Sequence, residues 1–386
     1  MLFSQINPIL WVTLGLSCTF GVGCQPQTRP ETFASPSNSP ISNSASVINS
    51  PIEYLGEFKI PTGFIFQNTP LGGLSGITYD AQRNLYYALS DDRAIQGPAR
   101  FYNIEIEIEL NPLAVNPIGV TSLVDQSSRP FPTYTVDPEG IALTRRDTLF
   151  ISSEGDVERD IQPFIKEFSR EGKELQSLPI PDKFIAQNGH GIRNNQAFES
   201  LTLSPSEQFL YTATETALIQ DGEPANLEKG TPVRILQYDL TTGQPVQEFY
   251  YLTEPVQTEP KYPDGLTIHS LVELLAWDET KLLSLERGFT EDVGNTVLLY
   301  EVSLGDATDI QQIESLKEVD IQNIQPAQKR LLLELRTLDI PLDNLEGMTF
   351  GPKLADGRRS LILVSDNNFN PLQVTQFLVF AINLEE

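Results

Sequence analysis

The residues of this chain that are best suited to chemistry are carboxylates that recur in similar short motifs. One set follows a short apolar run in each of five segments, and a second set lies in the run before it. The first set is Asp91, Glu154, Glu215, Glu286 and Asp366, and the second is Glu139, Glu199, Glu273 and Glu346, with Ser75 in the matching place of the first segment. Carboxylates gathered at one place repel one another unless cations lie among them. Such a cluster suits Ca²⁺, which takes about six to eight oxygen ligands. Alternatively, each glutamate could accept hydrogen bonds from backbone N–H groups of a neighbouring segment and so join the two.

Few other side chains have comparable chemistry. Asn367, in the run SDNNFN, offers an amide oxygen, although Asp and Asn in succession are equally typical of a tight turn. The arginines close to the acidic motifs are Arg93, Arg100, Arg193 and Arg287. The chain lacks a G-x-S-x-G elbow and a phosphate-cradling glycine-rich loop. Its two histidines, His190 and His269, do not provide a multi-histidine zinc site.

The segments that carry these motifs predict an all-β fold. From about residue 52 onward, short runs of β-branched and aromatic residues alternate with Gly, Pro, Asn and Asp, and the pattern repeats five times. Each repeat contains three or four predicted strands, which is typical of the blade of a β-propeller. The last repeat lacks a fourth strand, and residues 54–61 before the first repeat can supply it and close the ring. We therefore expect five blades, or six if the segment 303–340 contains a degenerate blade; a large β-sandwich is the alternative.

Composition excludes several partners. The chain has 26 Lys and Arg against 52 Asp and Glu, a formal net charge of −26. This charge repels nucleic acid and anionic membranes and suits cations. Both cysteines, Cys18 and Cys24, precede the repeats, so the predicted fold has neither a disulfide nor thiol chemistry.

The N-terminus predicts export. Residues 8–22 are apolar but short for a membrane span, which is typical of a signal peptide. Gly23-Cys24 resembles a bacterial lipobox and makes Cys24 a candidate for lipidation. We expect a signal peptide over residues 1–24, a flexible Ser/Pro/Asn-rich tether over 25–51 and one folded domain over 52–386. The protein would then lie in the periplasm or on the envelope as a lipoprotein, with this anchor as its sole membrane contact, or it would be secreted.

The order of the motifs resembles that of a known family. SGITYD with LSDDR, DPEGIAL with ISSEGD, FESLTLSP with TATE, LLSLERGF, and LEGMTFGP with LILVSDNNF follow one another as they do in the esterase-like activity of phytase family, in its bacterial, cyanobacterial form. The resemblance covers roughly residues 52–384. It implies a propeller-like fold and hydrolysis of phosphate esters with bound Ca²⁺. The positions that it implies for the site are Asp91, Arg93, Glu139, Glu154, Asn195, Glu199, Glu286, Arg287, Glu346, Asp366 and Asn367.

These observations give one leading hypothesis and two others. The leading hypothesis is a metal-assisted phosphoester hydrolase. Its proposed metal ligands are Asp91, Glu139, Glu154, Glu199, Glu286, Glu346, Asp366 and Asn367, and its proposed catalytic groups are Arg93, Arg193, Arg287 and Asn195. The expected partner is a small anionic phosphoester, or another small ligand, bound through metal by a monomer. The second hypothesis is a non-catalytic propeller that binds a ligand or a protein, and the third is a carboxylic-ester hydrolase, for which a recognisable Ser-His pair is missing.

Overall fold

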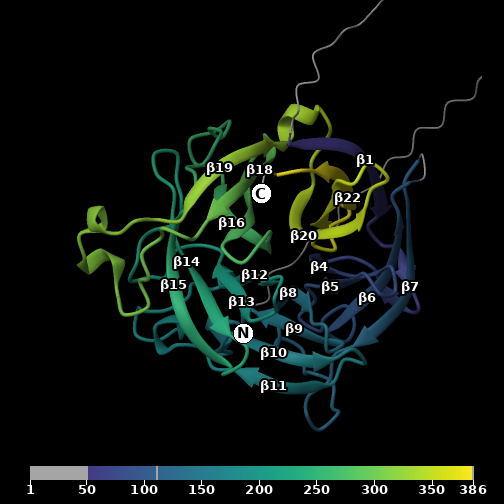
Figure 1. Ribbon diagram of the computed structural model, residues 1–386, viewed down its shortest axis with the longest axis horizontal. Helices are drawn as coiled ribbons and strands as arrows, with labels where there is room; N and C mark the ends of the chain where they lie inside the picture. The colour runs from purple at the N-terminus through teal and green to yellow at the C-terminus, as the bar shows by residue number, and fades with distance from the viewer. Residues whose placement is uncertain (1–50, 110–111, 385–386) are drawn as a thin grey trace, which may run out of the picture. The chain divides into compact units, whose positions relative to one another are not determined.

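The protein is a five-bladed β-propeller, as the sequence repeats predict. A computed structural model describes residues 51–109 and 112–384, so the predicted signal peptide, Cys24 and nearly all of the tether lie outside the described residues. The described chain forms five four-stranded antiparallel sheets around one axis (Figure 1). In the part of the chain that the structure describes, no helix is long and apolar enough to cross a membrane.

Four blades are built from consecutive strands. Blade 1 contains β4 (Leu74–Asp80), β5 (Leu85–Ser90), β6 (Arg100–Glu107) and β7 (Ala114–Ser122). Blade 2 contains β8 (Pro138–Leu143), β9 (Thr148–Ser153), β10 (Phe164–Ser169) and β11 (Glu174–Leu178). Blade 3 contains β12 (Phe198–Leu203), β13 (Phe209–Thr214), β14 (Pro232–Asp239) and β15 (Gln244–Leu252). Blade 4 contains β16 (Thr267–Ala276), β17 (Lys281–Thr290), β18 (Gly294–Ser303) and β19 (Gln328–Glu334).

The fifth blade closes the ring with the first strand of the chain. It contains β20 (Asn344–Lys353), β21 (Arg359–Asp366), β22 (Val374–Ile382) and, as its outer strand, β1 (Ile52–Pro61). The register pairs Ile52 with Ile382 and Pro61 with Val374. The expected closure is therefore confirmed, and it joins the two ends of the propeller in one sheet (Figure 1).

Five apolar clusters hold neighbouring blades together. Leu85, Tyr87 and Phe101 of blade 1, for example, pack with Ile141 and Leu149 of blade 2. Equivalent clusters join blades 2 and 3, 3 and 4, 4 and 5, and 5 and 1. A four-stranded sheet has two faces to bury, and stacking the sheets around the axis buries both. This explains why inner strands such as β5 are buried along their whole length, whereas the outer strand β7 is mostly half-buried or exposed.

The segment between β18 and β19 does not form a sixth blade. It contains the short 3₁₀ turns η3 (Leu316–Glu318) and η4 (Ile321–Asn323), and η5 (Leu335–Leu338) follows β19. Ile310, Leu316 and Ile324 pack on Tyr250 of β15, so this segment covers the outside of blade 3. The remaining short elements are β2 (Ile65–Phe66), β3 (Thr69–Pro70), η1 (Val157–Arg159) and η2 (Asp182–Phe184).

Glycines let the first strands of the blades approach closely at the axis. A Cβ on Gly76 would lie 2.4 Å from the carbonyl oxygen of Glu139, and one on Gly347 would lie 2.8 Å from that of Ser75. Both distances are shorter than any ordinary contact. The axis is therefore narrow at this level, and the acidic side chains just beside these glycines are brought close together.

Candidate functional site

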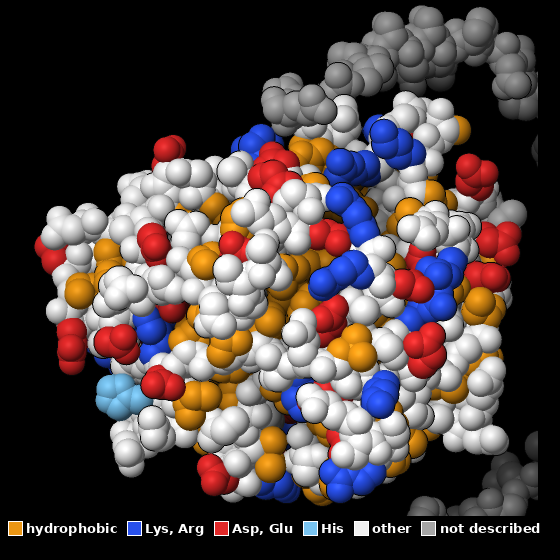
Figure 2. All heavy atoms as spheres, turned by 60° about the horizontal axis from the view of Figure 1, so that its bottom comes forward, with side chains coloured by type: hydrophobic (Ala, Val, Ile, Leu, Met, Phe, Trp, Pro, Cys, Tyr) orange, Lys and Arg blue, Asp and Glu red, His pale blue; other side chains and the backbone are white. Residues whose placement is uncertain are grey.

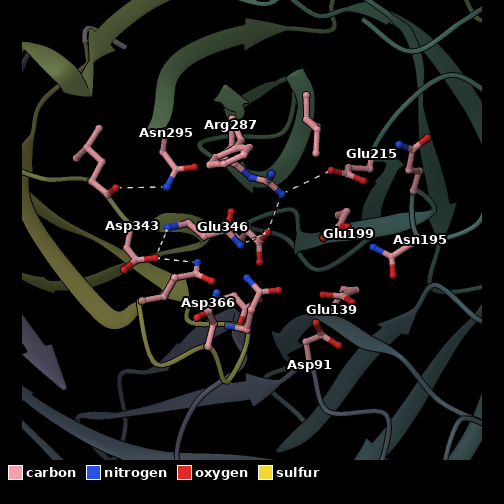
Figure 3. Close-up of a pocket in the computed structure, with 18 of the residues that line it drawn as sticks. Asp91, Glu139, Asn195, Glu199, Glu215, Arg287, Asn295, Asp343, Glu346 and Asp366 are labelled. Carbon is pink, nitrogen blue, oxygen red and sulfur yellow. Dashed lines mark hydrogen bonds and ion pairs between the residues drawn. The ribbon is translucent and has the colours of Figure 1, made fainter. Parts of the chain in front are cut away.

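A pocket of about 810 Å³ opens at one end of the propeller axis. It lies where the first strand of each blade begins and the second strand ends (Figure 3). The acidic residues that line it are Asp91, Glu139, Glu199, Glu215, Asp343, Glu346 and Asp366. The predicted convergence of carboxylates from different repeats is thus present in the structure.

A β-bulge positions the inner carboxylates. In every blade, the register between the first and second strands shifts near the start of the first strand. The extra residue leaves the ladder, and such a bulge re-aims a side chain. The residues at the shift are Ser75, Glu139, Glu199, Val272 and Glu346. On the second strand of each blade, one residue pairs with the first strand just before the shift. The residues that come next along the second strand are Asp91, Glu154, Glu215, Arg287 and Asp366.

Blade 4 departs from this pattern and corrects the sequence alignment by one residue. The shift lies between Leu271 and Glu273, so Val272, and not Glu273, is equivalent to the other inner glutamates. Glu286 pairs with Leu271, and therefore Arg287 takes the place of the carboxylate on the second strand. One blade thus contributes a positive charge and an apolar residue where other blades contribute acids.

Glu273 and Glu286 have partners elsewhere in the fold. The Glu273 carboxylate is buried and accepts hydrogen bonds from the backbone N–H groups of Leu274 (2.9 Å) and Leu201 (3.3 Å), which ties blade 4 to blade 3. Glu286 is fully buried, and its carboxylate contacts Tyr251 Oη (2.6 Å), Lys329 Nζ (2.7 Å) and His269 Nε2 (2.8 Å). Neither side chain lines the pocket.

Six acids form two triads, and Asp343, Glu346 and Asp366 line the pocket outside them. Asp91, Asp137 and Glu139 form the first, and Glu154, Glu199 and Glu215 form the second; within each, carboxylate oxygens lie within 4.8 Å of one another. Glu215 follows the repeated pattern at the ends of second strands. Asp137, two residues before Glu139, has no acidic counterpart in the other repeats, so the repeat pattern does not predict it.

Burial and mutual repulsion raise the pKa of these carboxyl groups. For Glu139, burial is the larger cause, and the charges of Asp91 and Glu199 raise its pKa further. For Glu199, burial again comes first, followed by Glu154 and Glu215. Burial also raises the pKa of Asp366, and the charge of Glu346 raises it further. The pocket would therefore hold protons or bind cations at neutral pH.

Two arginines offset part of this charge. Arg287 Nη2 lies 2.8 Å from Glu346 Oε1 and 3.7 Å from Glu215 Oε1. Arg93 lies beside the first triad, with its Nε 2.7 Å from Asp137 Oδ1, and it also donates to Asn195 Oδ1. Asn195 in turn lines the pocket.

Three further predicted or nearby residues lie away from the pocket. Arg193 donates to the carbonyl oxygens of Ala217 and Gly222 and stabilises a loop of blade 3. Asn367 is buried, and its Oδ1 accepts hydrogen bonds from the backbone of Gly73 and of Phe369, as a turn residue would. Arg100 is fully buried against Asp92.

The donor set of the triads fits a hard divalent cation. Every triad ligand is a carboxylate oxygen, which Ca²⁺ and Mg²⁺ prefer, and soft sulfur or histidine ligands are missing from both triads. The acidic clusters of this pocket could therefore bind a metal ion.

Sequence comparison identifies the family. The model of a family described as esterase-like activity of phytase, or phytase-like, matches residues 69–369. The chain belongs to this phytase-like family. The matched range includes both triads, Arg93, Arg287 and Asp366, so the charged part of the candidate site lies within the phytase-like region.

Other comparisons are more distant. The phytase-like chain is 29% identical over 143 residues to an uncharacterized secreted protein of Arthroderma benhamiae, in a match that covers 31% of this chain and 27% of that protein. Among solved structures, the Dos1 propeller has a TM-score of 0.36 at 7% identity and covers 83% of this chain and 71% of its own. An α-L-arabinofuranosidase from Lactobacillus brevis has a TM-score of 0.41 at 9% identity, covering 82% and 92%. These TM-scores are too low to support an inference about function.

Proposed function

We propose that this phytase-like protein is an exported hydrolase that cleaves phosphoesters with the help of divalent cations. The observation that carries the proposal is a pair of carboxylate triads, four of whose six members line one pocket on the axis together with Arg287. Ca²⁺ is the cation that we expect, because the ligands are all oxygens and flexible glutamates predominate. In the reaction, water attacks phosphorus, the bond from phosphorus to the alcohol oxygen breaks, and the alcohol leaves with a proton.

The carboxylates and the arginines of the site have different roles in this proposal. One cation would be held by Asp91, Asp137 and Glu139, and a second by Glu154, Glu199 and Glu215. Arg287 presents its guanidinium to the pocket and orients a phosphoryl oxygen, while Arg93 holds Asp137 and Asn195 in place. A bound divalent cation would neutralise charge on the phosphoryl group and lower the pKa of a water molecule.

The experiment is an assay of the purified chain on several phosphomonoesters, with Ca²⁺ and then with a chelator. The expected result is release of inorganic phosphate with Ca²⁺. With the chelator, the rate should fall by a factor of at least about 100, because a metal ion stabilises the transition state by several kcal/mol. A folded chain without activity in both conditions would refute the proposal. Mg²⁺ and Mn²⁺ in parallel assays identify the preferred cation.

A non-catalytic propeller that binds a ligand is the second candidate. It is favoured by Glu154, whose Oε1 accepts a hydrogen bond from the backbone N–H of Ala197 in the loop that leads into blade 3. An acid used in this way contributes to the joint between blades. Binding of metal and of a phosphonate without any turnover of phosphoesters would favour this candidate.

Export and anchoring are part of the proposal. The secreted relative from Arthroderma benhamiae supports export. β1 begins opposite the pocket, because Ile52 pairs with Ile382 at the far end of β22. A lipid on Cys24 would anchor the propeller to a membrane through the predicted tether. Labelling of cells with a radioactive fatty acid, with Cys24→Ser as the control, tests the anchor.

A further inference from the structure

One wall of the pocket is apolar. Leu266, Ile268 and Phe289 come from blade 4 and the loop before it, and Leu342 and Leu372 come from segments of blade 5. This wall lies on the side of the pocket where the acidic pattern is interrupted by Val272 and Arg287. The lining from blades 1, 2 and 3 is thus polar and acidic, and all the apolar residues of the lining come from blades 4 and 5, where Asp343, Glu346 and Asp366 accompany them.

Two leucines of the wall are exposed although their backbones are held in place. Leu372 is 92% exposed and Leu266 is 54% exposed. The N–H of Leu372 donates to Asn370 Oδ1 (3.0 Å), and the N–H of Leu266 donates to Glu291 Oε2 (2.9 Å). Exposed apolar side chains on a hydrogen-bonded backbone beside a polar cavity are typical of a surface that contacts a ligand.

The guanidinium and the apolar wall are adjacent. Arg287 and Phe289 lie two residues apart on β17, and alternate residues of a strand point to the same side. The Nε–H group of Arg287 is buried and has no acceptor within the described part of the chain. A phosphoryl group next to Arg287 would therefore place the rest of the ligand near Phe289, Ile268 and Leu266.

The charge of the lining limits how many phosphates the ligand can carry. Seven carboxylates and one guanidinium line the pocket. Even two divalent cations would leave this lining with a negative formal charge. A densely phosphorylated substrate would meet repulsion that a single phosphate largely avoids.

We propose that the substrate is a phosphomonoester with a single phosphate and an apolar alcohol, alkyl or aryl, which lies on the wall formed by Leu266, Ile268, Phe289, Leu342 and Leu372. This inference rests on the proposed function for the reaction, in which water cleaves the bond between phosphorus and the alcohol oxygen. Its evidence is the wall and the charge, which are independent of turnover.

Calorimetric titration of the full chain in saturating Ca²⁺ with methyl-, butyl- and hexylphosphonate tests the inference. These ligands keep the phosphoryl group and are not hydrolysed. Each buried methylene group is expected to tighten binding by up to about fourfold. Inositol hexakisphosphate, titrated in the same buffer, is expected to bind more weakly than hexylphosphonate.

Matched variants localise the effect. In Leu266→Ser/Leu372→Ser, the gain from methyl- to hexylphosphonate should fall at least about threefold, while methylphosphonate binds as before. Leu175→Ser is the control, because Leu175 is 46% exposed on the outer strand β11 and should leave the series unchanged. Leu175, Leu266 and Leu372 are all exposed, so the variants are expected to fold.

The outcomes separate this inference from the proposed function. Equal affinities along the series, no binding of any phosphonate, an unchanged series in the double variant or tighter binding of inositol hexakisphosphate would overturn the inference. Binding in the expected order without turnover of butyl or hexyl phosphate would remove the proposed function and leave the inference standing. Turnover of methyl and hexyl phosphate with equal kcat/KM would support the proposed function and overturn the inference about the substrate.

Discussion

Arg287 of blade 4 lies 2.8 Å from Glu346 of blade 5, in the position where the equivalent residue of every other blade is an acid. Glu215 of blade 3 lies 3.7 Å from the same guanidinium nitrogen. Burial alone would lower the pKa of Arg287, but Glu346, Glu215 and Glu199 raise it above its ordinary value. One arginine thus links three blades at the end of the axis.

Loss of this guanidinium should destabilise the metal-free protein. Arg287→Met leaves the buried carboxylates of Glu346 and Glu215 uncompensated, and breaking a buried ion pair costs about 3–5 kcal/mol. Urea unfolding measures the change. Arg129→Met is the matched control, because the Arg129 side chain is 75% exposed beside Asp125 and should contribute at most about 1 kcal/mol. Similar losses in both variants would contradict the role assigned to Arg287.

The stability of the metal-free protein should depend on pH, and bound metal should remove this dependence. The pKa values of Asp91, Glu139, Glu199 and Asp366 are raised by burial and by neighbouring carboxylates. A raised folded-state pKa means that the folded chain holds more protons than the unfolded chain, so metal-free stability should fall as pH rises from about 4 towards the raised values. Saturating Ca²⁺ replaces those protons and should remove this fall. Thermal unfolding between pH 4 and pH 8, with and without Ca²⁺, checks both statements; a metal-free Tm that does not fall with pH would contradict them.

The sequence repeats predict most of the fold. They do not predict the site completely, because they do not show where the strand register shifts. The repeated strand patterns predict five blades and closure by residues 54–61, and the structure has five blades closed by Ile52–Pro61. A bulge shifts pairing by one residue without a mark in the apolar pattern, and so Glu273 and Glu286 were aligned in place of Val272 and Arg287. Asp137 joins its triad through a loop conformation specific to blade 2, which no repeat signals.

Glutamine substitutions should separate two cation sites. Glu139→Gln and Glu199→Gln each remove a charged ligand from one triad, so each is expected to weaken one Ca²⁺ binding event by at least about tenfold, and the double variant should weaken both. Glu273→Gln is the control, because its amide oxygen can still accept from the backbone N–H groups of Leu274 and Leu201. Calorimetric Ca²⁺ titration reports the affinities. A fall in Ca²⁺ affinity in the control equal to that in either triad variant would refute the assignment of the triads.

Glu286 should matter for stability and leave Ca²⁺ binding unchanged. Its buried carboxylate contacts Tyr251, Lys329 and His269, and although burial would raise its pKa, His269 and Lys329 lower it below its ordinary value. Glu286→Gln removes the negative charge beside Lys329 Nζ and should cost about 3 kcal/mol in urea unfolding at pH 7. Because the folded-state pKa is lowered, this stabilisation should be present above the unfolded pKa and be lost as pH falls through the folded value. Lys329→Met in the background of Glu286→Gln should cost much less than it does in the native chain, since the charge pair is already gone. Independent costs, or weaker Ca²⁺ binding in the Glu286→Gln chain, would instead make Glu286 part of the metal centre.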